Sequence, residues 1–204
     1  MESLRLPSIP ELRAIAQSLA MLDAILCSEW QYRYFSFNSA WAPCMEMASM
    51  RNGSGDDWFL LLDSVGAALK GFAHELASDH ALGASLQTQV PHEFSAFLNE
   101  PAFSMQNATF CYWRKADDST WHKVQGSLPD DGSVEMLSHL VAGPSGYKEW
   151  AEAYYELPVD LQGVSAVFDH VPLSAAIVLA LNSDADLDST LREAAEISYP
   201  CHTA

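Results

Sequence analysis

Four short apolar segments between residues 30 and 74 are the feature that most constrains how this chain can fold. Each has the length of a β-strand, and from Trp30 to Phe37 aromatic side chains occupy both faces of an alternating pattern. Short turns, most of them containing glycine, separate the segments. This spacing predicts a contiguous antiparallel meander, with strands near residues 30–37, 45–51, 58–63 and 67–73.

The segments on either side of this meander have helical and hairpin patterns. Residues 9–27 repeat apolar side chains at helical spacing, and Ser8 with Glu11 predicts a capping box at the start of that helix. Residues 109–115 and 120–124 predict a further hairpin.

Beyond residue 132 the apolar pattern is helical. Stripes separated by prolines predict helices within residues 133–197, the last with Leu187, Leu191 and Ala195 on one apolar face. The predicted fold class is therefore α+β: an amino-terminal helix, a mostly antiparallel sheet meander, and a carboxyl-terminal acidic helical region packed on the sheet.

Charge is distributed unevenly along this chain, which we expect to form one domain over residues 1–204. Its 27 carboxylates outnumber its 10 Lys and Arg residues, for a formal net charge of −17. The helix and sheet part, residues 1–125, carries a net of −6, whereas the acidic helical part, residues 126–204, carries −11. Hydrophobic residues make up 49% of the chain, so it can fold and its charge lies on the surface. Such a surface repels nucleic acid and anionic membranes and attracts basic partners.

No feature of the sequence indicates export or a membrane. The segment after Met1 lacks the basic and apolar regions of a signal peptide, and the longest strongly apolar run, residues 175–181, is too short to span a bilayer. The four cysteines are scattered without a C-x-x-C pair, unlike those of a small disulfide-stapled secreted domain. We therefore expect a cytoplasmic protein with no membrane partner.

The densest group of metal-capable side chains is His74, Glu75, Asp79 and His80. A zinc-binding helix needs two histidines four residues apart, so that both imidazoles face one ion. Here the histidines are six apart, which puts them on opposite sides of a helix, and in a strand they would be about 20 Å apart. We expect a solvated loop and no metal. A metal-assisted hydrolase using these four residues is the alternative hypothesis.

Other segments match known site motifs only in part. Residues 182–188 carry acids at alternating positions, as a calcium loop does, but neither phasing has both the turn glycine and the twelfth-position acid. We interpret them as a helix amino terminus, where carboxylates cap backbone N–H groups. The turn at residues 52–55 lacks the lysine and helix of a phosphate loop, and Ser145 lacks a nucleophile elbow. We expect no cofactor and no catalytic residue.

Aromatic residues concentrate on the predicted strands and on one helix. Their size favours burial in the core, and any that is left exposed would be a good anchor for a protein partner. Arg33 and Arg51 lie on the same strands, so we expect at least one of them to pair with a carboxylate. A small-ligand binding module lined by these aromatic strands is a further hypothesis.

Several segments resemble an uncharacterised family of bacterial proteins. They are Tyr32–Trp41, Met50–Asp57, Gly71–Glu75, Glu149–Glu156 and His170–Leu173. The resemblance covers most of the chain and implies a bacterial source, but it implies no activity and no functional residue.

Charge, size and the lack of a catalytic motif favour a non-enzymatic module that binds a basic protein. Glu149, Glu152 and Glu156 are spaced three and four apart, so we expect them to share one face of a helix and to form part of the binding surface. One form of this hypothesis is an immunity or antitoxin-like inhibitor that masks a basic toxin such as a nuclease.

Overall fold

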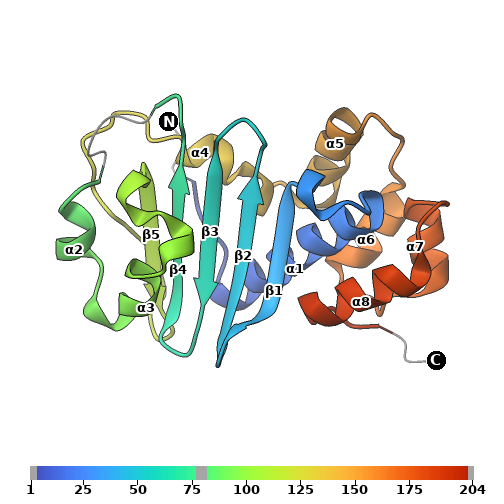
Figure 1. Ribbon diagram of the computed structural model, residues 1–204, viewed down its shortest axis with the longest axis horizontal. Helices are drawn as coiled ribbons and strands as arrows, with labels where there is room; N and C mark the ends of the chain where they lie inside the picture. Colours follow the sequence, from blue (N-terminus) through green and yellow to red (C-terminus); the bar gives the residue numbers. More distant parts are fainter. Residues whose placement is uncertain (1–3, 77–81, 202–204) are drawn as a thin grey trace.

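One six-stranded antiparallel sheet organises the fold (Figure 1). The computed structural model describes residues 4–76 and 82–201. The chain forms an α+β fold, and the predicted meander is confirmed, because the strands follow one another across the sheet in chain order. They are β1 (Phe35–Ala42), β2 (Met45–Arg51), β3 (Asp57–Leu62), β4 (Gly66–Phe72), β5 (Phe110–Lys115) and β6 (His122–Lys123).

Helices precede, interrupt and follow the sheet. The α-helices are α1 (Ile9–Leu26), α2 (Ser85–Gln89), α3 (Ser95–Leu98), α4 (Ser133–Met136), α5 (Gly143–Tyr155), α6 (Leu161–Phe168), α7 (Ala175–Leu181) and α8 (Leu187–Ile197). Single 3-10 turns lie between them: η1 (Trp30–Tyr32), η2 (His92–Phe94), η3 (Pro101–Phe103), η4 (Met105–Asn107) and η5 (Ser138–Leu140).

The first strand begins later than its aromatic pattern predicts. Trp30 and Tyr32 belong to the turn η1, with 54% and 60% of their surface exposed, and β1 starts at Phe35. The extended segment predicted from Trp30 is therefore wrong at its start. The carboxylate of Asp23 on α1 accepts hydrogen bonds from the backbone N–H groups of Tyr34 (2.9 Å) and Phe35 (2.7 Å), so a contact distant in sequence holds the chain where the strand begins.

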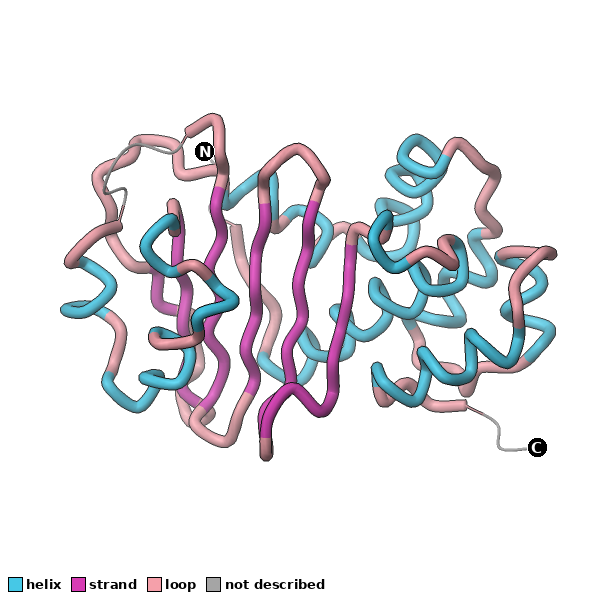
Figure 2. The backbone as a smooth tube through the Cα atoms, viewed as in Figure 1, coloured by secondary structure: helices cyan, strands magenta, loops and turns pink. Residues whose placement is uncertain are grey.

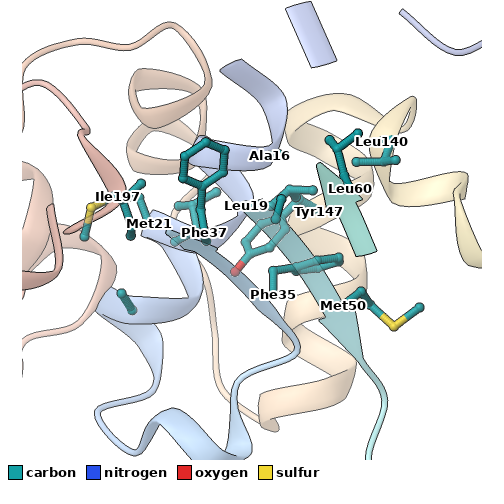
Figure 3. Packing of buried hydrophobic residues seen from close by; sticks show 14 of the residues in the cluster. Ala16, Leu19, Met21, Phe35, Phe37, Met50, Leu60, Leu140, Tyr147 and Ile197 are labelled. Atoms are coloured by element: carbon teal, nitrogen blue, oxygen red, sulfur yellow. The ribbon is translucent and has the colours of Figure 1, made fainter. Parts of the chain in front are cut away.

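The two faces of the sheet are both covered, each by a different set of helices. On one face Phe35 and Phe37 of β1, with Met50 of β2, pack on α1 and the carboxyl-terminal helices (Figure 3). On the other face Phe59 and Leu61 of β3 pack under the segment from α2 to η4. Because successive side chains of a strand point to opposite faces, the strands supply apolar side chains to both cores. Each fully buried apolar side chain contributes about 1.5–3 kcal/mol to the stability of the fold.

The helix α1 lies at the centre of the larger core. The predicted capping box is confirmed: the Ser8 N–H donates to the Glu11 carboxylate at 2.9 Å, and the Glu11 N–H donates back to the Ser8 hydroxyl. From Ala16 to Leu26 every residue of α1 is buried, because the helix contacts β1, α6 and α8 at once. A helix covered on all sides in this way positions the elements around it.

The helices α5 to α8 gather beyond the β1 edge of the sheet, at one end of the molecule (Figures 1 and 2). The carboxylate of Asp186 accepts from the Ser189 N–H at 3.0 Å and caps α8, which confirms the helix-terminus interpretation of residues 182–188. Within the described residues, no helix is both long enough and apolar enough to cross a membrane.

The buried face of α8 differs from its predicted apolar stripe. Thr190, Ala194 and Ile197 are buried, whereas Leu191 and Ala195 are exposed. The helix α8 contacts α1 and β1, and its buried residues include the small Thr190 and Ala194 as well as the larger Ile197. The predicted last helix is confirmed as α8, and Leu187 packs partly buried against the core, but Leu191 and Ala195 do not share its buried face.

Candidate functional site

The proposed metal cluster is only partly within the described residues. His74 and Glu75 follow β4, whereas Asp79 and His80 lie outside the described residues. His74 is already engaged: its ring Nδ1 lies 2.7 Å from the Asp56 carboxylate, and its backbone N–H donates to the same oxygen at 2.8 Å. In the part of the chain that the structure describes, no three His, Cys, Asp or Glu side chains lie together as a metal site.

The acidic helical part leaves most of its carboxylates without a cationic partner. Of its thirteen acids, three form ion pairs, namely Asp131 with Lys123, Glu152 with Lys148, and Glu193 with Arg33. The other ten are all exposed, and among the described residues none has a Lys, Arg or His nitrogen within 4.0 Å. These are Asp130, Glu135, Glu149, Glu156, Asp160, Asp169, Asp184, Asp186, Asp188 and Glu196.

Eight of these ten carboxylates lie on α5 to α8 or in the loops that join them, and we call them the acidic helical end. They are Glu149, Glu156, Asp160, Asp169, Asp184, Asp186, Asp188 and Glu196. Apolar side chains are exposed among them, including Leu161, Leu179 and Leu191. This end of the molecule therefore combines negative charge with the apolar contact area that a protein interface needs.

The structure does not leave Glu149, Glu152 and Glu156 together on one unoccupied helix face. Glu149 is exposed on α5. The Glu152 carboxylate binds the Lys148 ammonium at 2.6 Å and accepts the Val159 N–H at 3.1 Å. Glu156 lies just beyond the last turn of α5 in the left-handed conformation, with φ of 55°, so its side chain does not continue the face of the helix that carries Glu149 and Glu152. Of the three, Glu149 and Glu156 belong to the acidic helical end.

A second feature is a pocket of about 220 Å³ where β1 begins and β2 ends. We call it the aromatic–arginine pocket. It is lined by Trp30, Gln31, Tyr32, Arg33, Tyr34, Ser36, Ser49, Arg51, Gly53 and Tyr154. None of these residues is acidic, although the chain as a whole carries a net charge of −17.

The two arginines of this pocket have different surroundings. Arg33, which lies between η1 and β1, forms an ion pair with Glu193 at 2.8 Å and donates to the Cys27 carbonyl at 2.8 Å, which confirms that at least one of the two arginines pairs with a carboxylate. The Arg51 guanidinium instead lies over the Trp30 ring at 5.3 Å and the Phe59 ring at 5.6 Å from their centroids. Such cation–π contacts orient the side chain without neutralising its charge.

The sequence raised the hypothesis of a small-ligand module lined by the aromatic strands, but it did not locate this pocket, because Trp30 and Tyr32 were expected within a strand and lie on the turn η1. Their exposure on η1, beside Arg51 of β2, depends on how the chain enters β1. The available signal was the presence of two arginines, Arg33 and Arg51, among aromatic residues of a strongly acidic chain.

The carboxyl group of Asp23 holds the wall of this pocket in place. It is fully buried on α1 and accepts the Tyr147 hydroxyl of α5 at 2.7 Å, in addition to the backbone N–H groups at the start of β1. Burial raises the pKa of Asp23 to about 6, although these hydrogen bonds favour its charged form. Because no part of it reaches solvent, Asp23 positions α1, β1 and α5 and cannot touch a ligand in the pocket.

Comparison of the chain with protein-family models, curated proteins and solved structures finds no match. The resemblance to a bacterial family therefore stays a prediction. The aromatic–arginine pocket draws most of its lining from two of the segments that carry that resemblance, Tyr32–Trp41 and Met50–Asp57.

Proposed function

We propose that this protein is a non-enzymatic binding module whose acidic helical end docks a basic protein in the cytoplasm. An immunity or antitoxin-like inhibitor of a basic toxin is the specific form of this proposal. The observation that carries it is the set of eight exposed carboxylates of the acidic helical end, none of which has a Lys, Arg or His nitrogen within 4.0 Å among the described residues.

Unpaired charge at one end of a molecule acts mainly on the rate of association. A complementary pair of surfaces raises the association rate constant toward 10⁸–10⁹ M⁻¹s⁻¹ at low salt, against about 10⁵–10⁶ M⁻¹s⁻¹ without steering. Carboxylates already paired within the chain, such as Glu152, contribute little to this attraction. The exposed Leu161, Leu179 and Leu191 supply apolar area for the docked complex. The four cysteines are free thiols, which supports a reducing compartment.

To test this proposal, association is measured with basic proteins encoded by the genes adjacent to the gene of this protein. Stopped-flow association with such a protein should slow at least tenfold between about 0.02 M and 0.3 M ionic strength, because the Debye length shrinks over that range. Replacing either Glu149 or Glu196 by lysine changes the charge by two units. Acting on a partner charge across about 10 Å of water, this change should lower the low-salt association rate constant roughly threefold.

The matched control is Asp117→Lys, the same charge change in the exposed turn between β5 and β6, at the other end of the sheet. It should leave the rate constant near that of the wild type. Glu152 is left unchanged, because its carboxylate holds the Val159 N–H and its loss would disturb the loop. Equal effects of Glu149→Lys and Asp117→Lys, or association that is insensitive to salt, would contradict the proposal.

A further inference from the structure

The aromatic–arginine pocket is lined by cationic and aromatic side chains, in a protein that is strongly acidic overall. Its lining contains two arginines and no carboxylate. The charge of Arg33 is balanced by Glu193, and the nearby Lys70 ammonium is held by the Asp57 carboxylate at 2.6 Å. Arg51 is left, with no carboxylate within 4.0 Å among the described residues and no side-chain hydrogen bond to any of them.

The Arg51 side chain is held in place by neighbouring aromatic rings, and no nearby carboxylate of the described residues takes up its charge. Asp57 lies opposite it in the β2–β3 register, but that carboxylate is committed to Lys70. Contacts with the rings of Trp30 and Phe59 restrict the Arg51 side chain before any ligand arrives. A guanidinium group presents planar, paired N–H donors that match the two oxygens of a carboxylate. Less conformational freedom is then lost on binding than for a cation on an unsupported side chain.

The rest of the pocket favours a compact ligand with a flat apolar body. Trp30 and Tyr32 are exposed on one side, and Tyr154 of α5 borders the pocket with 40% of its surface exposed. The hydroxyl groups of Ser36 and Ser49, 2.7 Å apart, lie on the sheet beneath. A volume of about 220 Å³ is below the range of roughly 300–1,000 Å³ that drug-sized ligands occupy, so a nucleotide would not be enclosed.

We propose that the aromatic–arginine pocket binds a small organic carboxylate, with the carboxylate on Arg51 and a planar apolar body against Trp30 and Tyr32. This inference is carried by the juxtaposition of exposed aromatic rings with a guanidinium that pairs with no described carboxylate, in a pocket whose lining contains no acid. It is independent of the proposed docking of a basic protein by the acidic helical end. The two sites can therefore fail or succeed separately.

Calorimetric titration of the full chain with sodium benzoate tests the proposal. Benzoate should bind saturably at one site. The Trp30 indole N–H resonance, identified by its loss in Trp30→Phe, should shift during the same titration. Benzyl alcohol keeps the ring without the charge, and inorganic phosphate keeps the charge without the ring. Each should bind at least tenfold more weakly than benzoate.

Three variants locate the site. Arg51→Met should weaken benzoate binding at least tenfold, and Arg51→Lys, which keeps the charge without the paired donors, should weaken it to an intermediate degree. Because Arg51 is exposed, both variants are expected to fold. Arg5→Met is the matched control, since Arg5 is exposed and precedes α1, whereas the pocket follows the other end of that helix, about 27 Å away.

The proposal is overturned by any of three results. These are no saturable benzoate binding, phosphate binding as tightly as benzoate, and equal losses in Arg51→Met and Arg5→Met. Circular dichroism spectra of each variant should match the wild type, so that a weaker titration reports on the site.

Discussion

Replacing the buried Asp23 should reveal how strongly one carboxyl group joins three elements of this fold. In Asp23→Ala the N–H of Phe35 and the hydroxyl of Tyr147 lose a buried acceptor, and the N–H of Tyr34 loses a half-buried one. An unsatisfied buried donor costs about 1–3 kcal/mol. We therefore expect the free energy of unfolding to fall by roughly 3–5 kcal/mol, a large share of the typical 5–15 kcal/mol.

The variant Asp23→Asn shows how much of the stability comes from the hydrogen bonds of this side chain and how much depends on its charge. Its side-chain oxygen can still accept both backbone N–H groups, and its NH₂ group can donate to the Tyr147 oxygen, so the loss should be only about 1 kcal/mol. The same variant removes the titrating group, whose pKa is raised by burial to about 6.

The sign of the pH effect follows from that shift. A carboxyl group with a pKa higher in the folded than in the unfolded protein contributes stability below its unfolded value, near 3.8, and loses it as the pH rises through about 6. Between pH 5 and pH 8 this loss amounts to about 1.4 kcal/mol. The unfolding free energy of Asp23→Asn, relative to the wild type, should rise by that amount over this range.

Urea unfolding followed by circular dichroism at pH 5, 6, 7 and 8 measures the difference. The range begins at pH 5 because the sequence pI is about 4.5, where low net charge promotes precipitation. Other carboxyl groups titrate in both proteins and cancel in the comparison. The reasoning fails if the difference between wild type and Asp23→Asn is constant with pH, or if Asp23→Ala is no less stable than Asp23→Asn.

Two further substitutions test the packing. Gly71→Ala would place a Cβ atom 1.9 Å from the ring of the fully buried Phe110, so thermal unfolding should show a loss of about 3 kcal/mol. Wild-type stability in that variant would mean that Phe110 has room to move. Trp58→Ala should cost about 3–5 kcal/mol because Trp58 is 1% exposed, whereas Trp30→Ala should cost less than about 1 kcal/mol, its main contact being with Arg51. Similar losses for the two tryptophans would show that exposure does not set the cost.

Features decided by neighbouring residues could be predicted from the sequence. The capping box of Ser8 and Glu11, the cap of α8 at Asp186, and the meander of β1 to β4 are all confirmed. Each depends on hydrogen bonds between residues a few positions apart or on turns too short for any other connection. The excess of acids in residues 126–204 is likewise a property of composition, and it anticipated the acidic helical end.

Features decided by what packs against a segment could not be predicted. Alternating aromatic residues are compatible with a strand or an exposed turn. Trp30 lies on an exposed turn, and the strand begins only where the backbone N–H groups of Tyr34 and Phe35 are bound by the Asp23 carboxylate of α1. Which residues of α8 are buried was likewise decided where that helix contacts α1 and β1. Which carboxylates and arginines are paired with each other depends on residues far apart in sequence, such as Arg33 and Glu193. Local pattern determines what each segment can form, whereas burial and charge pairing are decided between segments that meet only in the folded protein.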